Sequence, residues 1–432
     1  MTNLKHLNLW VWKWHCIAGL IVLPFFILLA ITGSIYLFKQ DYEQSAYSHI
    51  REVTPQGSAI SYQQQWAIAQ ENSSQTLSEL ILPDRSSSYD SSQTEVSSLA
   101  TQFKAGRFSK SSYVFVDPYS ATVTGSYAVK DTLMQKVRKL HGELLLGKWG
   151  THVIELVASW IVVMVVTGLF LWWPKQGFKG YGLVRIRWNQ GTRTRYRDLH
   201  ALVGFWTSAL ILAILAGGLP WTEVVGGNFK TLRDSTQTGY PSHWHNSKGL
   251  ESQQIGTPLT LDQMVAKAQT LDLKGTVTIK LPQSEGAVFS VTNRAPQLHS
   301  QQVYHFDQYS GQLIKHLTWA DVGALSHGRQ IVMRFHQGEL FGPANWWLIL
   351  ITALLLAGLA IVGAASYLAR KPKNQWAIPQ APEGFKVSFG VIAIILVLSL
   401  LLPLFGASVL AILLGHWLHH LWQRRLLQNP AS

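Results

Sequence analysis

Six apolar runs, four of them long, set the class of fold that this sequence can adopt. They lie at about residues 15–38, 153–173, 201–221, 346–368, 388–402 and 405–420. The first four are each long enough to cross a bilayer, because a transmembrane helix needs about 20 apolar residues. A signal peptide would have a shorter apolar core and then a small-residue cleavage site, so we interpret the first run as an uncleaved helix. We predict a polytopic α-helical membrane protein with about six transmembrane helices.

The composition supports a membrane setting and excludes several kinds of site. Only 14% of the 432 residues are charged, and the chain holds 18 Trp, a residue that collects at membrane interfaces. The formal net charge of +13 would suggest a nucleic-acid partner in a soluble protein, but here the basic residues lie mostly in short loops beside apolar runs. Cys16 is the single cysteine, which excludes internal disulfides, CxxCH haem attachment, zinc–thiolate sites and iron–sulfur sites.

Basic residues in the loops predict how the chain is oriented. The loop between the second and third runs carries seven Lys and Arg residues against Asp198 alone, and Arg370, Lys371 and Lys373 follow the fourth run. Loops rich in Lys and Arg stay on the cytoplasmic side. We therefore predict a protein of the bacterial inner membrane with both termini in the cytoplasm and two long polar inserts in the periplasm.

The last two apolar runs are separated by Pro403 and allow two interpretations. Lys386 precedes the pair, and Arg424 and Arg425 follow it, so both ends prefer the cytoplasmic side. This favours a tight helical hairpin. A single kinked helix is the alternative.

These patterns divide the chain into eight segments. They are transmembrane helix 1 (10–38), a first insert (39–140), an interfacial helix with transmembrane helix 2 (141–174), a basic cytoplasmic loop (175–197), transmembrane helix 3 (198–222), a second insert (223–335), an interfacial helix with transmembrane helix 4 (336–369) and the C-terminal hairpin (387–421). Each insert has a helical stretch, at 62–70 and 261–271, followed by runs with strand-like alternation. The inserts are therefore predicted to be α+β domains.

Two ungapped alignments indicate that the chain contains one unit twice. The first alignment places His15 on His200, Gly19 on Gly204, and Gly33 on Gly218. The second places His141 on His336, Gly147 on Gly342, Gly168 on Gly363, and Lys175 on Arg370. Both copies enter the membrane from the same side, so this parallel duplication has its pseudo-twofold axis along the membrane normal. Equivalent residues then lie at equal depth on opposite sides of the axis.

The duplication pairs histidines at two depths. His15 meets His200 near the cytoplasmic face, and His141 meets His336 near the periplasmic face. A neutral imidazole can bind haem iron, and two axial ligands approach it from opposite faces. Two such pairs predict two non-covalent haem b groups stacked across the membrane, an arrangement that moves electrons between compartments. The alternative is that each histidine is an interfacial side chain satisfied by water or lipid headgroups.

Further residues bear on these two sites. Gly19 and Gly204, one turn after the first pair, would leave room for the edge of a porphyrin. His152 is the runner-up ligand on the periplasmic side, because it follows His141 by three helical turns and could share its face. Its counterpart in the other half is Trp347, so the symmetry does not support it, and a supporting role beside a ligand or a propionate is the alternative.

Other titratable side chains have weaker patterns. Glu155 is the only carboxylate well inside a predicted span, which makes it a functional candidate. No chain of ionisable residues continues through the midplane, which argues against a metal permease or a proton-coupled transporter. We interpret the following histidines as interfacial or solvated: His416, His419, His420, His243, His245 and His327. The following basic residues could hold propionates or attract an anionic chelate, or could be ordinary surface charge: Lys136, Arg138, Lys139, Arg329 and Arg334.

Several motifs together resemble the PepSY-associated transmembrane helix family over nearly the whole chain. They are His15 with Gly19 and Thr32–Gly33, the run Leu140–His–Gly–Glu…Gly147…Gly168…Trp172–Trp–Pro, the run Arg197–Asp–Leu–His200…Gly204, and the two Asp-containing hairpins near 117 and 307. Members of this family include inner-membrane ferric-siderophore reductases with two b-type haems. The resemblance implies PepSY-like periplasmic domains and the haem ligands His15, His141, His200 and His336.

The resemblance also implies an activity. We expect a haem-dependent ferric-chelate reductase that reduces a ferric siderophore in the periplasm and so releases Fe(II), and no catalytic side chain is assigned. Some relatives carry a fused flavin and nicotinamide reductase module, whereas this sequence has no GxGxxG motif before a helix. The expected electron donor is therefore quinol or a separate cytoplasmic reductase. The alternative is a haem-free PepSY membrane regulator that binds a peptidase or a cell-wall partner.

Overall fold

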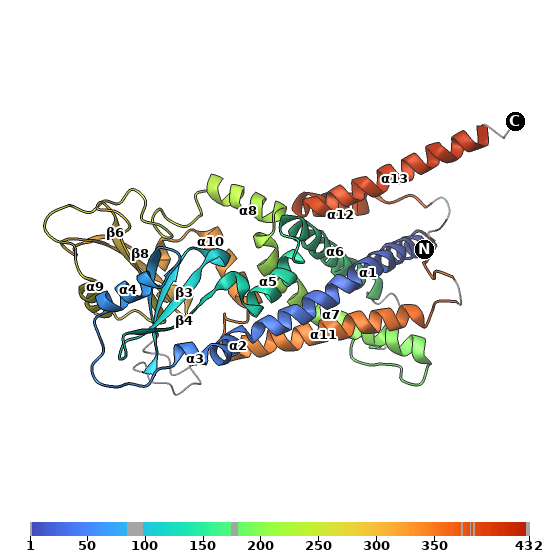
Figure 1. The fold of residues 1–432 in the computed structure, drawn as a ribbon. Helices are drawn as coiled ribbons and strands as arrows, with labels where there is room; N and C mark the ends of the chain where they lie inside the picture. The colour runs from blue at the N-terminus through green and yellow to red at the C-terminus, as the bar shows by residue number, and fades with distance from the viewer. Residues whose placement is uncertain are drawn as a thin grey trace.

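The computed structural model describes residues 2–83, 98–173, 180–372, 375–380, 382 and 385–428. A helical bundle forms one part of the molecule, and a β-sheet with short helices forms the other (Figure 1). Three residues of the predicted basic segments, Lys175, Lys179 and Lys373, lie outside the described residues.

Five helices are long and apolar enough to cross a membrane. They are α1 (Thr2–Leu37), α6 (Lys148–Trp172), α7 (Thr192–Gly218), α11 (Pro343–Leu368) and α13 (Pro403–Gln428). α12 (Phe389–Leu401) is also apolar but has only 13 residues, which is about 20 Å of helix against a hydrocarbon core of about 30 Å. The described chain therefore offers five candidate spans where the sequence predicts about six.

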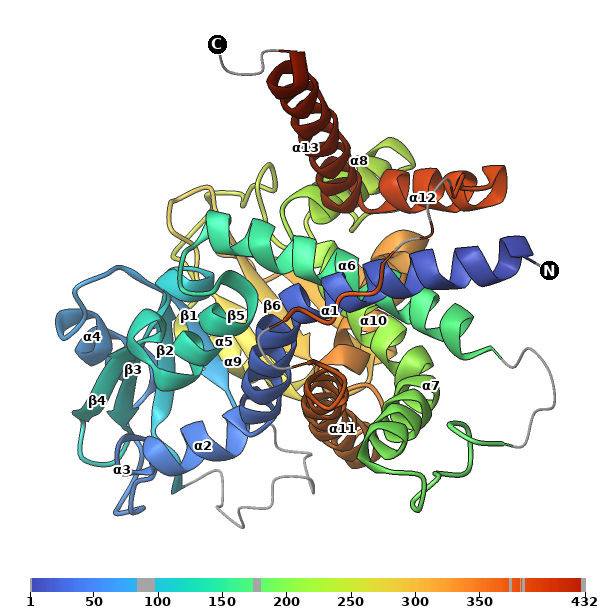
Figure 2. The same ribbon diagram turned by 90° about the vertical axis from the view of Figure 1, so that its right-hand side faces the viewer.

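α12 and α13 are separate helices that meet at Leu402. This residue has φ −126° and ψ 78°, because the following Pro403 disfavours the helical conformation at the residue before it. α13 contacts α6 and then extends away from the bundle in a different direction from α12 (Figures 1 and 2).

Two short helices, α5 (Leu133–Glu143) and α10 (Ala324–His336), lie between the sheet and the bundle (Figure 1). A glycine starts the long helix that follows each of them. Gly147 has φ 60° and ψ −138°, and Gly342 has φ 60° and ψ −142°. This conformation is strained for any residue with a Cβ atom, so the two aligned glycines start α6 and α11 in the same way.

The two inserts form one antiparallel sheet of eight strands in the order β4-β3-β2-β1-β5-β6-β7-β8. The strands are β1 (Leu77–Leu82), β2 (Thr101–Ala105), β3 (Ser112–Asp117), β4 (Thr122–Ala128), β5 (Thr276–Lys280), β6 (Val288–Arg294), β7 (Gln302–Asp307) and β8 (Leu313–Thr318). β1 pairs with β5, with Leu80 opposite Ile279, so hydrogen bonds join the two inserts. Alternation in a sequence predicts strands but not their partners, and this pairing is a finding of the structure.

α4 (Tyr62–Glu71) and α9 (Leu261–Gln269) cover one face of the sheet. Their first turns meet, because the carboxylate of Asp262 accepts the backbone N–H groups of Tyr62 at 2.7 Å and Gln63 at 3.1 Å. The Gln63 side chain accepts the N–H of Leu261 at 3.0 Å in return. Each helix therefore helps to cap the other, and these contacts join the inserts at the end far from the bundle (Figure 1).

Shorter elements connect these parts. α2 (Lys39–Ala46) and α3 (Ser48–Arg51) lead from α1 toward the sheet, and α8 (Val224–Ser235) leads from α7 into the second insert. Single turns of 3₁₀-helix lie at Phe108–Lys110, Val129–Asp131, Leu219–Trp221, Leu298–Ser300 and Trp319–Asp321. In the bundle, α1 packs against α6 and α11, and α7 packs against α6, α10 and α11.

The cap between the inserts can be tested. Asp262→Ala removes the acceptor of two N–H groups at the start of α4, and a lost N-cap acceptor costs about 1 kcal/mol. We expect a lower Tm in thermal unfolding of the purified protein. Glu71→Ala is the matched control, because this carboxylate at the other end of α4 has no hydrogen bond within the described chain. Equal Tm values for the two variants would contradict the proposed role of the cap.

Candidate functional site

His141 and His336, here called the sheet-side pair, come from the last turns of α5 and α10. Their ring centres are 6.2 Å apart and the ring planes make an angle of 75°. Burial lowers the pKa of His141 to about 4, and the neighbouring His336 adds to this effect. Burial also lowers the pKa of His336. Both rings are therefore neutral at pH 7, which is the form that binds metal ions.

His15 and His200, here called the loop-side pair, line one cavity of about 870 Å³. Side chains of α1, α6, α7 and α11 form its wall. Its volume falls within the range of about 300–1,000 Å³ that is typical of cofactor and ligand pockets. The structure therefore brings each predicted histidine together with its predicted partner.

A glycine lies beside each ring of the loop-side pair. A Cβ atom at Gly168 would come within 3.2 Å of Cε1 of His15, and one at Gly363 would come within 3.2 Å of Cε1 of His200. A side chain at either position would push the imidazole away from the helix. The glycines thus set how closely each ring approaches the backbone of α6 or α11.

The sheet-side pair is packed in the same way. A Cβ atom at Gly33 on α1 would lie 3.3 Å from Cε1 of His141, and one at Gly218 on α7 would lie 3.5 Å from Cε1 of His336. All four of these glycines occupy aligned positions in the sequence, but the alignment alone does not show that they lie beside the imidazole rings.

Gly19 and Gly204 differ from these four glycines, because they line the loop-side cavity without lying beside an imidazole ring. Both line the loop-side cavity, as expected of glycines that make room for a flat ligand. A Cβ atom there would make ordinary contacts, at 3.4 Å from Met164 and 3.8 Å from Leu359. The lack of a side chain at these two positions widens the cavity, and a Cβ atom there would not contact either histidine.

The two pairs lie at opposite ends of the bundle. Gly33 lies beside His141 and therefore at the level of the sheet-side pair. His15 and Gly33 are eighteen residues apart on α1. His200 and Gly218 have the same separation on α7. Eighteen helical residues span about 27 Å, close to the thickness of the hydrocarbon core of a bilayer.

Each of the four rings has one engaged and one open nitrogen. Nδ1 of His15 contacts the hydroxyl of Thr167 at 2.9 Å, and Nδ1 of His141 contacts the hydroxyl of Thr32 at 2.9 Å. Nδ1 of His200 contacts the carbonyl of Leu359 at 3.3 Å, and Nδ1 of His336 contacts the carbonyl of Ile214 at 2.7 Å. No Nε2 atom of the four makes a hydrogen bond within the described residues. Each ring therefore keeps one nitrogen available for a ligand.

Polar groups line part of the loop-side cavity. Asp198 is buried and binds Arg187 through two N–H groups, at 2.6 Å and 2.7 Å. Three buried atoms of the wall have no hydrogen-bond partner in the described part of the chain: Asn8 Oδ1, Tyr367 Oη and Arg370 Nε. An unpaired buried polar atom costs about 1–3 kcal/mol, so these three atoms are free to bind polar groups of a molecule in the cavity.

His152, the runner-up ligand, lies apart from the sheet-side pair. α5 ends at Glu143, and Leu144 and Leu145 have φ values of 49° and 60°, so no continuous helix joins His141 to His152. Nδ1 of His152 instead donates to the carbonyl of Lys148 at 2.7 Å. The shared helical face that made His152 a candidate is therefore absent.

Glu155 has a structural explanation. The residue is fully buried on α6, and its two carboxylate oxygens accept the N–H groups of Val224 at 2.9 Å and Val225 at 2.8 Å. These are the first two residues of α8, whose N-terminal N–H groups have no partners within the helix. The carboxylate thus anchors the start of α8, where the helix dipole also favours a negative charge.

Several other candidate residues are held by ordinary contacts. Arg334 donates to the carbonyls of Pro296 at 2.8 Å and Ala295 at 3.0 Å, which ties α10 to the sheet domain. Nε2 of His327 donates to the carbonyl of Trp319 at 2.8 Å. His416 and His420 lie on the exposed surface of α13, with ring centres 4.5 Å apart.

The long apolar helices and the mixed domain beside them define a multi-pass membrane protein. The family model of the PepSY-associated TM region matches residues 12–370. The chain therefore belongs to the PepSY-associated transmembrane family. No curated protein matches it.

Variants of Glu155 distinguish an anchor from a functional acid. Glu155→Leu leaves two buried N–H groups unpaired, at about 1–3 kcal/mol each, whereas Glu155→Gln keeps one acceptor. We expect Tm to fall further for Leu than for Gln, with no change in the cofactor content of the purified protein. Loss of cofactor at unchanged Tm would instead indicate a functional carboxylate.

Proposed function

We propose that this protein transfers electrons across a bacterial inner membrane through two haem b groups and reduces a ferric chelate, such as a ferric siderophore, in the periplasm. His15 and His200 would bind one haem, and His141 and His336 the other. The observation that carries the proposal is the presence of two histidine pairs at opposite ends of the bundle, each ring with an open Nε2.

The number of side chains in each pair favours a haem over a bare metal ion. Protein sites for bare ions such as zinc use three or four side chains. Within the described residues, no group of three or more His, Cys, Asp and Glu side chains is placed to hold a metal. A haem brings its own equatorial ligands and needs only the two axial imidazoles that each pair offers.

The hydrogen bonds at Nδ1 favour the tautomer that iron requires. A backbone carbonyl only accepts hydrogen bonds, so Nδ1 of His200 and of His336 must carry the proton. Nε2 then has a free lone pair. Metal-binding histidines usually donate their other ring N–H in this way, which fixes the ring orientation and raises the basicity of the ligand.

In His141 and His15, a threonine hydroxyl accepts the proton of Nδ1 in place of a carbonyl. Thr32 donates its own proton to the carbonyl of Leu28 at 2.6 Å, so its oxygen must accept from Nδ1 of His141. Thr167 is bound likewise to the carbonyl of Val163 at 2.8 Å and accepts from His15.

The spacing of the sheet-side pair agrees with axial ligation. Imidazole nitrogens lie about 2 Å from a bound metal, so two imidazoles on opposite sides of it have ring centres roughly 6 Å apart. The observed separation is 6.2 Å. A bound haem supplies reversible one-electron chemistry at its iron.

Two of the three unpaired polar atoms of the loop-side cavity can donate hydrogen bonds to the haem carboxylates. Arg370 offers a charge and the N–H at Nε, and Tyr367 offers a hydroxyl. Charged hydrogen bonds of this kind are stronger than neutral ones. These two side chains would orient the haem, and the apolar wall around them would exclude water.

The charges of the loops support the proposed direction of transfer. The basic residues lie beside the loop-side pair, so we propose that this end faces the cytoplasm and that the sheet lies in the periplasm. Each ferric ion takes up one electron, and Fe(II) then leaves the chelator. Quinol would supply two electrons and release two protons, and so would serve two ferric ions in succession. A separate cytoplasmic reductase is the other donor class.

The internal duplication is part of this proposal. The matching His–Gly contacts of the two halves and the mirrored strand order support it. We propose that the short α12 completes a C-terminal hairpin with α13 and that the duplicated core holds both haems.

Single histidine variants test the two sites separately. We expect the purified protein to be red, with a low-spin bis-histidine spectrum and two haems per chain. His200→Ala should remove about half of the haem, from the loop-side site, and His336→Ala should remove the other half, because a pair with one imidazole loses an axial ligand. His152→Ala is the control and should retain both. Colourless protein from haem-replete cells would contradict the proposal and favour the regulator instead.

The threonines provide a finer test of ligand positioning. Thr167→Val and Thr32→Val leave one Nδ1–H without an acceptor, and loss of such a partner weakens metal affinity about 10- to 100-fold. We expect haem loss on dilution from the loop-side site in the first variant and from the sheet-side site in the second, with partial rescue by Ser. Thr352→Val is the control, because this buried threonine binds the carbonyl of Leu348 and touches no histidine. Equal haem retention in all three variants would contradict this role.

A further inference from the structure

A row of polar residues crosses the face of the sheet opposite α4 and α9. The strand register places Lys104 beside Glu79, and Glu79 beside Lys280, on three adjacent strands. Their neighbours in sequence, such as Leu80 and Ile279, point into the core on the other face. Two lysines and one carboxylate therefore lie together in the middle of the eight-stranded sheet.

Basic side chains from other elements gather at this row. Burial lowers the pKa of His245, and Lys280, Arg233, Arg329 and Arg107 lower it further. These four residues come from β5, α8, α10 and the segment after β2. Contacts also place these elements together, because the Lys280 ammonium lies 3.4 Å from the carbonyl of His245, and the His245 ring packs against Tyr240 with ring centres 4.5 Å apart. Four separate elements thus bring basic side chains near His245.

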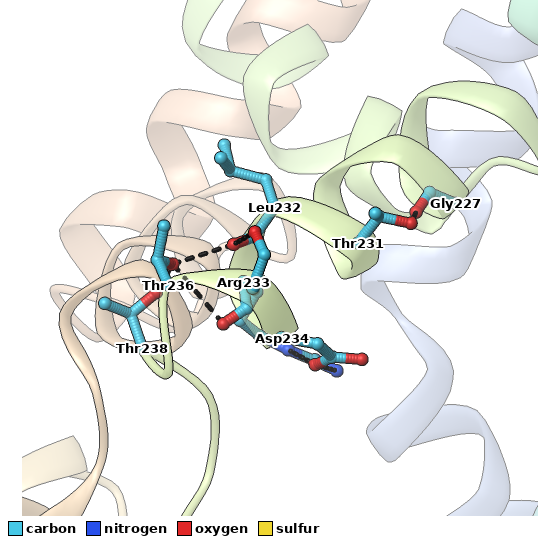
Figure 3. A network of polar contacts seen from close by, with 8 residues as sticks. Gly227, Thr231, Leu232, Arg233, Asp234, Thr236 and Thr238 are labelled. Atoms are coloured by element: carbon cyan, nitrogen blue, oxygen red, sulfur yellow. Dashed lines mark hydrogen bonds and ion pairs between the residues drawn. The ribbon is translucent and has the colours of Figure 1, made fainter.

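We name Lys104, Arg107, Arg233, Lys280 and Arg329 the cationic face. Two of its charges are paired: Lys104 lies 2.7 Å from Glu79, and Arg233 lies 2.9 Å from Asp234. Figure 3 shows Arg233 and Asp234 at the C-terminal end of α8, where Thr236 closes the last turn with a hydrogen bond of 2.7 Å to the carbonyl of Leu232.

Within the described chain the remaining charges form no ion pair, although Glu79, which binds Lys104, lies beside Lys280 in the strand register. In the described residues, Arg107, Lys280 and Arg329 form no ion pair, and the Lys280 ammonium only contacts the carbonyl of His245 at 3.4 Å. Lys280 and Arg329 are partly buried, whereas Arg107 is exposed. A partly buried positive charge without an ion pair is unfavourable, and a bound anion would reduce this cost.

Arg329 links this face to the sheet-side pair. Its guanidinium lies over the ring of Trp221 at 3.9 Å, and its buried Nε atom has no partner in the described structure. Arg329 precedes His336 by seven residues on α10, which is two turns or about 10 Å on the same side of the helix. The equivalent residue in the first half is Met134, so the feature belongs to one half only.

We propose that the cationic face binds the iron substrate as an anionic chelate, with carboxylate or catecholate oxygens bound by Arg329, Lys280 and Arg107. This proposal rests on the proposed function and adds the class and the place of the substrate. Arginine binds paired oxygens through its planar fork, and lysine adds a point charge. A chelate held here would lie close to the sheet-side pair. A cationic hydroxamate complex of iron would be repelled.

Binding can be measured without any electron transfer. The probes are radiolabelled Fe(III)–citrate, which is anionic, and the Fe(III) complex of desferrioxamine B, which is cationic. Equilibrium dialysis against the full-length oxidised protein in nanodiscs, without a reductant, gives Kd for each. We expect the citrate complex to bind and its affinity to fall as the salt concentration rises, because salt screens exposed charges. Stronger binding of the cationic complex would overturn the proposal.

Charge-neutral variants locate the site. Arg329→Gln and Lys280→Gln should each weaken Fe(III)–citrate binding about tenfold or more, since a hydrogen bond to a charged group contributes about 1.5–3 kcal/mol. Arg107→Gln changes an exposed residue and should do the same without disturbing the fold. Lys315→Gln is the matched control, because Lys315 lies in the same row on the edge strand β8, beyond His305. Equal Kd values for all four variants would overturn the proposal.

The two proposals fail in distinguishable ways. Protein that contains both haems but does not bind Fe(III)–citrate overturns the assignment of the cationic face and leaves electron transfer standing. Protein that binds the anionic chelate through Arg329 and Lys280 but holds no haem supports the site and overturns electron transfer.

Discussion

The bundle depends on four imidazole rings that each lie against the backbone of a neighbouring helix. A ring can come this close only where the helix has no side chain, and Gly33, Gly168, Gly218 and Gly363 supply those positions. The same approach brings Nδ1 within reach of a carbonyl or of a hydroxyl bound to one. One contact thus fixes the ring rotation, selects the tautomer and leaves Nε2 without a hydrogen bond in the described residues.

The two histidines of each pair bind different kinds of atom through Nδ1. In the first half a threonine just before the glycine accepts the ring proton, and in the second half the carbonyl four residues before the glycine does so. The residues aligned with Thr32 and Thr167 are Gly217 and Val362, which have no hydroxyl. The geometry of the ring is therefore kept while the side chains differ. The aligned positions 329 and 134 also differ, since one is Arg329 and the other is Met134, so the two halves have different charges beside the sheet.

The sequence predicts the parts of the structure that depend on local pattern or on the repeat. Apolar runs identify the long helices, and the two alignments identify the histidine pairs. The joined sheet was not predictable, because strand partners depend on contacts between distant segments. The break after α5 was missed since Leu144 and Leu145 adopt a left-handed conformation that leucine rarely takes. The role of Glu155 depends on α8, whose first N–H groups come 69 residues later in the chain.

The seam between β1 and β5 has a mechanical consequence. Backbone hydrogen bonds across this seam hold the halves at a fixed spacing beside the sheet, whatever lipids surround the helices. At the other end of the bundle, the described contacts between helices involve side chains, such as the hydrogen bond of Arg370 to Sγ of Cys16 at 3.3 Å. Changes in bilayer thickness or tension would therefore widen or narrow the distance between His15 and His200 more than that between His141 and His336. The two halves would therefore move about the β1–β5 pairing, which lies outside the lipid.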